Sequence, residues 1–184
     1  MNNIIVKTTS LVQHLTSMYL NKEAITVDCT CGNGNDTLFL ANSSKFVYGF
    51  DIQQQALVVT ERLLKENDKS NYQLILDGHE NIDKYVKDKC DVILFNLGYL
   101  PKGDKNITTT SNTTIKAVEK SLGLLKTNGL LVITCYYGHA EGKKERADLL
   151  EYISTLDKKY HIRKIDTLNS DKCPPEIILI TKTI

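Results

Sequence analysis

Two nearly unbroken apolar runs, DVILF at 91–95 and LLVIT at 130–134, constrain the fold of this chain most strongly. A strand that is apolar at almost every position buries both of its faces, as strands do in a parallel sheet covered by helices on both sides. The segments around these runs alternate between strand-like and helix-like patterns along the chain. This alternation predicts an α/β doubly wound fold with a mainly parallel sheet.

The strands and helices can each be placed on the sequence. Apolar and β-branched segments predict seven strands, at 24–30, 45–52, 72–78, 90–100, 130–137, 161–168 and 176–183. Helical periodicity predicts six helices, at 10–21, 35–43, 54–68, 80–88, 112–129 and 143–160. Ser10 is expected to cap the first helix, and Asn128-Gly129 to end the fifth. The last two strands are joined by the short segment NSDKCPP, which favours an antiparallel pair.

The chain is expected to form one domain, 1–184, because no linker, internal repeat or low-complexity tract interrupts it. No apolar run approaches the roughly 20 residues of a membrane-spanning helix, and the N-terminus lacks the pattern of a signal peptide. The five cysteines lie mostly in apolar segments, which is typical of reduced thiols in a cytoplasmic protein. Cys29 and Cys31 have no second pair at zinc-finger spacing, so we expect no metal site.

The formal net charge of +1 gives no general preference for nucleic acid, whereas a dedicated DNA-binding domain is usually far more basic. This charge does not exclude an RNA substrate that binds to a local basic patch. The sequence also leaves open whether the chain forms a homodimer.

Polar residues follow the predicted strands at their carboxyl ends, where open α/β sheets bind their ligands. In strand order these residues are Asp28, Asp51, Asp77-Gly78-His79, Asn96-Leu97-Gly98-Tyr99 and Tyr136-Tyr137-Gly138-His139. A series of carboxylates followed by an amide and aromatic rings predicts one ligand site along this edge of the sheet.

Three kinds of ligand could account for the glycine-rich turn at 28–36. A triphosphate loop needs a Lys after the glycines, and none follows here. A dinucleotide favours a third glycine where this chain has Thr37, although Asp51 lies about where a ribose acceptor is expected. Asp28 and Asp36 would repel a pyrophosphate, whereas an adenosyl amino acid carries an ammonium group and no phosphate. S-adenosylmethionine therefore fits the turn best.

The cofactor is expected to lie along the strand ends. Asp28 would orient the glycine turn or receive the methionine ammonium, and Asp51 would accept both ribose hydroxyls unless it caps the next helix. N–H groups of the turn and of the following helix would bind the methionine carboxylate. Asp77, Gly78 and His79 would line the adenine pocket, although a lone His is as often a packing residue. The predicted cofactor-binding residues are Asp28, Gly32, Asn33, Gly34, Asn35, Asp36, Asp51, Ile52, Asp77, Gly78, His79 and Asn96.

Four motifs at these strand ends carry a family resemblance: DCTCGNGNDTLFLA, FNLGYLP, YYGHAEGKKE and PPEIILI. With them the chain resembles the class I S-adenosylmethionine-dependent methyltransferases, and more narrowly the small bacterial YtqB-like family long labelled putative rRNA methylases. The resemblance implies a Rossmann-like fold and a tRNA methyltransferase that converts 5-aminomethyl-2-thiouridine at the wobble position to its 5-methylaminomethyl form. This family usually has an acidic residue before NLGYLP, where this chain has Phe95.

The segment from Asn96 to Pro101 resembles the NPPY loop of amino-directed methyltransferases, with Leu-Gly in place of Pro-Pro. In that arrangement Asn96 or a neighbouring carbonyl would accept a hydrogen bond from the target amine, and Tyr99 would stack on the base or close the pocket. Tyr137 or His139 would help the amine to lose its proton. The predicted catalytic residues are Asn96, Tyr99, Tyr137 and His139.

The expected partner is the anticodon stem-loop of a tRNA, with neither DNA nor a membrane. Basic residues near this edge could contact its phosphates, but interleaved Glu141, Glu145, Asp148 and Glu151 favour a solvated helix face almost equally. The predicted substrate-binding residues are Leu97, Gly98, Pro101, Lys102, Lys143, Arg146, Pro174 and Pro175. The alternatives are an N-methyltransferase for ribosomal RNA or a small molecule, an NAD-dependent oxidoreductase, or a binding module that lost its chemistry.

Overall fold

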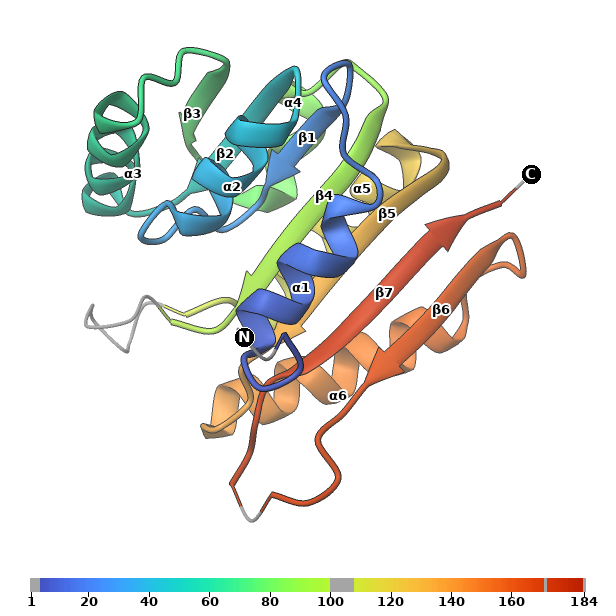
Figure 1. The fold of residues 1–184 in the computed structure, drawn as a ribbon. Helices are drawn as coiled ribbons and strands as arrows, with labels where there is room; N and C mark the ends of the chain where they lie inside the picture. The colour runs from blue at the N-terminus through green and yellow to red at the C-terminus, as the bar shows by residue number, and fades with distance from the viewer. Residues whose placement is uncertain (1–3, 100–107, 171, 184) are drawn as a thin grey trace.

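A seven-stranded sheet runs through the part of the chain that the computed structural model describes, residues 4–99, 108–170 and 172–183 (Figure 1). Its strands lie in the order β3-β2-β1-β4-β5-β7-β6. Strands β1 to β5 are parallel, whereas β7 is antiparallel to both of its neighbours. The bounds are β1 (Ile25–Asp28), β2 (Phe46–Asp51), β3 (Tyr72–Leu76), β4 (Cys90–Leu97), β5 (Leu125–Cys135), β6 (Tyr160–Ile165) and β7 (Glu176–Lys182). The predicted parallel sheet with a C-terminal antiparallel pair is confirmed.

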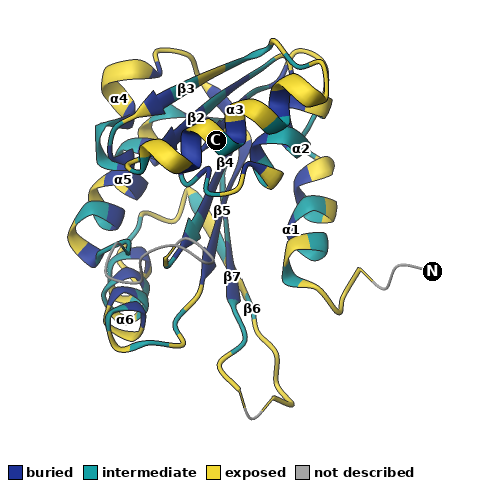
Figure 2. Ribbon diagram, turned by 90° about the vertical axis from the view of Figure 1, so that its left-hand side faces the viewer, coloured by how far each residue is buried: buried dark blue, intermediate teal, exposed yellow. Residues whose placement is uncertain are grey.

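Helices cover both faces of this sheet, as the edge-on view in Figure 2 shows. One face packs against α1 (Thr8–Ser17), α2 (Asn35–Ser43) and α3 (Gln54–Glu66), and the other against α4 (Ile82–Tyr85), α5 (Ser111–Leu124) and α6 (Ala140–Ser154). A short 3-10 helix, η1 (His79–Asn81), precedes α4. None of the described helices is long and apolar enough to cross a membrane.

Strand β4 shows why its sequence is almost continuously apolar. Val92 and Leu94 pack into the core under α1–α3, whereas Ile93, Phe95 and Leu97 pack into the core under α4–α6. All five side chains are at most 2% exposed. The predicted burial on both faces is confirmed.

The junction between α5 and β5 differs from the prediction. The fifth helix was expected to run to Asn128-Gly129, but α5 ends at Leu124 and β5 begins at the next residue. Leu125 pairs with Cys90 and Leu130 with Val92, so the residues between them bulge out of the ladder. Asn128 has a φ of 62°, a left-handed conformation that Asn tolerates better than most residues. The Asn-Gly pair therefore marks an irregular turn inside a strand and not a helix end.

The predicted cap of the first helix is also wrong. Helix α1 begins at Thr8, so Ser10 lies inside it, and the preceding Lys7 makes no side-chain capping hydrogen bond. Helix α6 begins three residues earlier than expected and ends at Ser154, before the predicted end at 160.

The strand order reverses between β1 and β4. From this point the sheet extends to one side through β2 and β3, and to the other side through β5, β7 and β6. In sheets of this kind, ligands bind beyond the carboxyl ends of the two strands at the reversal, which here are β1 and β4. The N–H of Cys29 donates to the carbonyl oxygen of Leu94 at 2.8 Å and joins the two strands there.

Candidate active site

The glycine turn after β1 has a conformation that other residues adopt poorly. Gly32 has a φ of 53° and Gly34 a φ of 80°. A Cβ at Gly34 would lie 2.9 Å from the Cα of Thr60 in α3, so both the backbone and the space require glycine. Asp51 holds this turn against β2, because its Oδ2 accepts the Gly32 N–H at 2.9 Å and its Oδ1 accepts the Gln53 N–H at 2.9 Å.

Asp28 lies beneath the turn and is completely buried. Its Oδ2 accepts a hydrogen bond from Thr37 Oγ1 at 2.6 Å, and its Oδ1 accepts the Thr30 N–H at 3.1 Å. Burial and then the negative charge of Asp36, with a smaller effect of Asp51, raise the pKa of Asp28 to about 7, although both hydrogen bonds oppose the shift. These contacts fit the predicted role in orienting the turn. They also explain Thr37, which donates to a buried carboxyl where a dinucleotide site would carry glycine.

Asn96 lies near the end of β4, and α2 orients its side chain. Its Nδ2 donates to Oδ2 of Asp36 at 2.9 Å, and Gln13 of α1 donates to Oδ1 of the same carboxylate at 3.0 Å. The Asn96 N–H donates to Thr30 Oγ1 at 2.7 Å. An ionised carboxylate only accepts hydrogen bonds, so the NH₂ of the Asn96 amide must face Asp36. The amide oxygen is thereby turned away from Asp36, where it can accept a hydrogen bond from a ligand. The sequence reasoning missed Gln13 and Thr30.

The alternation along β5 separates two neighbouring tyrosines. From residue 92 in β4 and residue 130 in β5, even-numbered residues face α1–α3 and odd-numbered residues face α4–α6. Tyr136 thus shares the face of Asn96, is 40% exposed, and has a pKa raised by burial and by the charge of Asp36. Tyr137 lies on the other face, with the Arg146 guanidinium 4.9 Å from its ring centre. Tyr137, which was predicted to be catalytic together with His139, thus lies off the face of Asn96, and the period of two in this strand is the signal that places Tyr136 on that face.

The region after β3 holds a buried histidine. His79 is 8% exposed, its Nδ1 lies 3.3 Å from the carbonyl oxygen of Cys29, and burial lowers its pKa. Among the described residues its Nε2 has no hydrogen-bond partner, so a ligand could supply one. The ring packs edge-on against Phe95, with 5.6 Å between centres. Phe95, found where the family usually has an acidic residue, is here a core side chain beside His79.

Asp77 shapes the backbone next to this histidine. Its Oδ1 accepts the Gly78 N–H at 2.7 Å and Asn81 Nδ2 at 2.8 Å, and its Oδ2 accepts the Tyr85 hydroxyl at 2.8 Å. On the neighbouring strand, Ile52 follows Asp51 and is 59% exposed, which is unusual for an isoleucine. The structure therefore places an apolar surface beside polar groups at the ends of β2 and β3. Two further predicted cofactor contacts are also exposed: Asn33 in the turn and Asn35 at the first residue of α2.

The segment after Asn96 is closed by residues from further along the chain. Tyr99 pairs with Thr108 as an isolated antiparallel bridge, and its ring packs edge-on against His139, with 5.4 Å between centres. His139 Nε2 lies 3.4 Å from Thr108 Oγ1. Two predicted catalytic residues, Tyr99 and His139, are thus in contact. The predicted substrate residues Pro101 and Lys102 lie outside the described residues.

Other predicted substrate residues have structural partners. Leu97 is 2% exposed, so its side chain belongs to the core and only its backbone can reach a substrate. Arg146 donates from Nε and Nη2 to the two carboxylate oxygens of Glu176 at 2.6 Å each, and Glu176 is 1% exposed. A contact of Arg146 with RNA stays a prediction, and it would use the guanidinium N–H groups that do not bind Glu176. Lys143 is exposed, Gly98 directly follows β4, and Pro174 and Pro175 are half-buried before β7.

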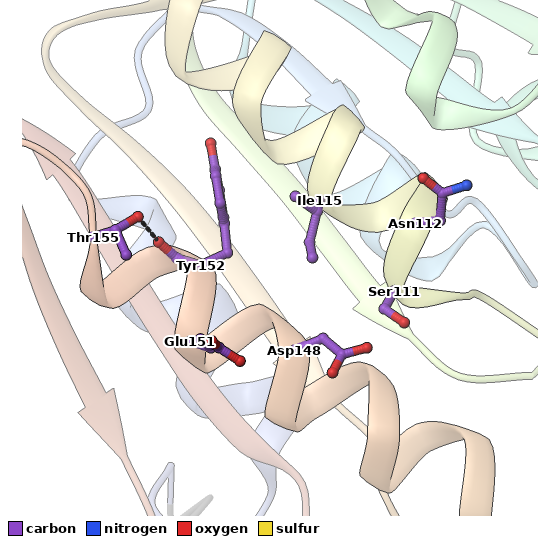
Figure 3. Close-up of a pocket in the computed structure, with 7 residues that line it drawn as sticks. All are labelled: Ser111, Asn112, Ile115, Asp148, Glu151, Tyr152 and Thr155. Atoms are coloured by element: carbon purple, nitrogen blue, oxygen red, sulfur yellow. Dashed lines mark hydrogen bonds between the residues drawn. The ribbon is translucent and has the colours of Figure 1, made fainter.

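The alternative of a solvated acidic face on α6 is wrong for Glu145. Glu145 is 2% exposed, and threonine hydroxyls hold its carboxylate. Asp148 and Glu151 instead line a groove of about 520 Å³ between α5 and α6 (Figure 3). This groove lies along the helices and not across the strand ends, and its two carboxylates suit it poorly to an anionic ligand.

Comparisons with known proteins identify relatives over most of the chain. The model of the family described as "Putative rRNA methylase" matches residues 47–181. The chain is 33% identical over 153 residues to a tRNA (mnm(5)s(2)U34)-methyltransferase, chloroplastic, from Arabidopsis thaliana, which covers 76% of this chain. The aligned part spans only 56% of that relative.

Two solved structures are similar over almost their whole lengths. A putative rRNA methylase from Clostridium thermocellum has 37% identity and a TM-score of 0.93, covering 96% of this chain and 97% of its own. A putative methyltransferase from Streptococcus mutans, solved in complex with SAH, has 40% identity and a TM-score of 0.90, covering 96% and 98%. SAH is what S-adenosylmethionine becomes after it gives up its methyl group, in agreement with the predicted cofactor. The predicted fold class and family are therefore confirmed, and this chain belongs to the methyltransferase family described as "Putative rRNA methylase".

Proposed function

We propose that this protein transfers a methyl group from S-adenosylmethionine to the amine of 5-aminomethyl-2-thiouridine at the tRNA wobble position. The observation that carries the proposal is the Asn96 amide, which Asp36 orients at the reversal point of the sheet. The similarity to the Arabidopsis thaliana tRNA methyltransferase supports the choice of substrate. Family membership gives no support to the alternative of an NAD-dependent oxidoreductase.

The cofactor would lie across the ends of β1, β2 and β3. Each oxygen of Asp51 accepts one backbone N–H, and a carboxylate has about four lone-pair sites, so two ribose hydroxyls can still bind. Ile52 offers an apolar surface for adenine, and Nε2 of His79 offers a buried polar atom. The N–H groups that begin α2 have no partner inside the helix, which suits them to the methionine carboxylate.

The acceptor amine would approach from the side of Asn96 and Tyr136. Oδ1 of Asn96 accepts one amine N–H and thereby aims the nitrogen lone pair at the sulfonium methyl. In the transfer the S–CH₃ bond breaks, the N–CH₃ bond forms, and sulfur keeps the electron pair. Most of the acceleration then comes from alignment, which is worth several kcal/mol in well-oriented reactions.

The amine must be neutral when it attacks. A nearby sulfonium and partial removal of water both lower the pKa of an alkyl ammonium, so it loses its proton more readily. Of the two predicted proton acceptors, His139 contacts Tyr99 at this edge, whereas Tyr137 lies on the other face of the sheet. We therefore assign His139 as the acceptor of the proton that the substrate ammonium loses, and Tyr136 as the residue that contacts the base.

The test is nucleoside mass spectrometry on tRNA that carries 5-aminomethyl-2-thiouridine, after incubation with the protein and S-adenosylmethionine. The expected result is that this nucleoside gains the mass of one CH₂ unit. Absence of the gain, with binding of S-adenosylmethionine shown by calorimetry, would refute the tRNA assignment. Ribosomal RNA is the second candidate, because the family description names it, and it would be assayed in the same way.

Two variants test the site itself. Asn96→Ala should abolish most turnover while S-adenosylmethionine still binds, because the amide oxygen that orients the amine is lost. Tyr137→Ala is the control, since that ring lies on the other face, and it should retain most of the activity. Near-normal turnover of Asn96→Ala would show that this amide does not position the acceptor.

A further inference from the structure

A chain of hydrogen bonds links α6 to the backbone that follows Asn96. Glu145 Oε2 accepts a hydrogen bond from Thr109 Oγ1 at 2.7 Å, and Oε1 accepts one from Thr114 Oγ1 at 2.6 Å. Thr109 Oγ1 in turn accepts the Gly98 N–H at 2.9 Å. Because the Thr109 hydroxyl has one proton and donates it to Glu145, its lone pairs are free to receive the Gly98 N–H. The direction of the chain is therefore fixed.

Gly98 has a backbone conformation that needs such support. Its φ is +143°, which L side chains rarely adopt, and an added Cβ would lie 3.2 Å from the Cβ of Tyr136. Thr109 holds it twice, because the Thr109 N–H also donates to the Gly98 carbonyl oxygen at 3.2 Å. One residue thus contacts both polar groups of the sharp turn directly after the acceptor-orienting segment.

Glu145 would be costly to bury without these partners. A carboxylate removed from water must be hydrogen-bonded, and this one is 2% exposed with one hydroxyl on each oxygen. Burial raises its pKa, and the hydrogen bonds from Thr114 and Thr109 oppose that shift. The two hydrogen bonds connect Glu145 to different parts of the protein. The bond from Thr114 joins α6 to α5, whereas the bond from Thr109 joins α6 to the residue that binds the Gly98 N–H.

We propose that Glu145 is a positioning residue for methyl transfer, which acts through Thr109 to fix Gly98 and with it the placement of Asn96 and Tyr99. The inference rests on the proposed function, because it assigns Asn96 and Tyr99 to the acceptor side. Glu145 itself lies in the core and touches neither substrate nor cofactor. Its contribution is to keep the turn in the one conformation in which the Asn96 amide and the Tyr99 ring both reach the acceptor.

A matched pair of variants separates positioning from packing. Thr109→Val and Thr114→Val each remove one hydroxyl from Glu145 at nearly constant volume, but only the first also removes the acceptor of the Gly98 N–H. We expect Thr109→Val to lower kcat on tRNA by about tenfold to a hundredfold, as small misplacements in a site do, with the Kd of S-adenosylmethionine unchanged. Thr114→Val should keep kcat within about twofold although it loses a comparable hydrogen bond. Thr109→Ser, which keeps the hydroxyl, should restore kcat.

A second measurement does not depend on the substrate. Amide hydrogen exchange at Gly98, followed by NMR, should become faster in Thr109→Val and should be unchanged in Thr114→Val. If wild type methylates no RNA but Gly98 shows this pattern, the proposed function fails and the assigned contact stands. If Thr109→Val does not fold, Glu145→Gln tests the same chain by exchanging a charge-assisted bond for a weaker neutral one. Equal kcat losses in both threonine variants, or unchanged exchange at Gly98, would overturn the proposal.

Discussion

Replacing Asp28 by Asn tests whether the buried carboxyl under the glycine turn makes the stability of the protein depend on pH between pH 5 and pH 8. The variant keeps the shape and both contacts, because Oδ1 can still accept the Thr30 N–H and Nδ2 can donate to the Thr37 hydroxyl, which then reverses its role. What it removes is the ionisable proton. A pH-dependent difference between wild type and Asp28→Asn therefore belongs to this one group.

The magnitude follows from the shift in pKa. Folding raises the pKa of Asp28 from 3.8 to about 7, so the folded state holds the proton more tightly than the unfolded chain. The group stabilises the fold fully below its unfolded pKa, and this advantage is lost as the pH rises through about 7. Each pKa unit corresponds to about 1.4 kcal/mol, so the whole effect is about 4 kcal/mol. About 2 kcal/mol is lost by pH 5 and about 4 by pH 8, which leaves 2 to 3 kcal/mol to be observed between these pH values.

The assay is urea unfolding of both proteins, without cofactor, at pH 5, 6, 7 and 8. The free energy of unfolding of wild type, relative to Asp28→Asn, should fall by 2 to 3 kcal/mol across this range, by the linkage relation above. Asp77→Asn is the control: although desolvation opposes it, hydrogen bonds from Tyr85, Asn81 and the Gly78 N–H lower the pKa of Asp77. The Asp77 carboxyl stays ionised throughout this range, so the difference in free energy of unfolding between wild type and Asp77→Asn should not change with pH. A constant difference for Asp28 as well would refute the assignment of a raised pKa.

Three further changes have clear expected outcomes. Gly34→Ala should lose roughly 1–3 kcal/mol in urea unfolding, because φ is 80° and α3 occupies the space of the new Cβ. Arg146→Met removes both hydrogen bonds of the guanidinium to the buried Glu176 carboxylate but leaves Lys164 at 3.4 Å from it, so the variant should lose about 2 kcal/mol by the same assay. Lys143→Ala should weaken RNA binding in filter assays and reduce the slope of log affinity against log salt by about 1 if this exposed side chain contacts a phosphate. Unchanged stability of the first two, or an unchanged slope for the third, would contradict these assignments.

The order of strands and helices was predictable because the residues that become buried form a periodic pattern of apolar side chains in the sequence. Val92 to Phe95 are apolar on both faces of one strand, and a parallel sheet covered by helices on both sides buries all four. The end of α5 was not predictable in this way, since the residues before Asn128 suit a helix and a strand about equally. The pairing of Leu125 with Cys90 places these residues in a strand. This contact joins residues far apart in the sequence, so local propensity cannot predict it.

The site was predictable to the level of the strand ends and not to the level of side-chain direction. Asn96 and Asp36 could be placed at one edge because parallel strands end together, but their 2.9 Å hydrogen bond depends on how α2 packs. Glu145 was misread because a glutamate among lysines usually lies in water. Its burial depends on Thr109 and Thr114, which the sequence does not show to be close.

The charges around the glycine turn give the site a preference that shape alone would not. Burial and the negative charges of Asp36 and Asp51 raise the pKa of Asp28. A further negative charge at the turn is therefore unfavourable. A pyrophosphate would add to that charge and be repelled, whereas a sulfonium and an ammonium would offset it. In the proposed reaction the sulfonium loses its positive charge when the methyl group leaves. The carboxylates of the turn would therefore attract the neutral-sulfur product less strongly than the methyl donor.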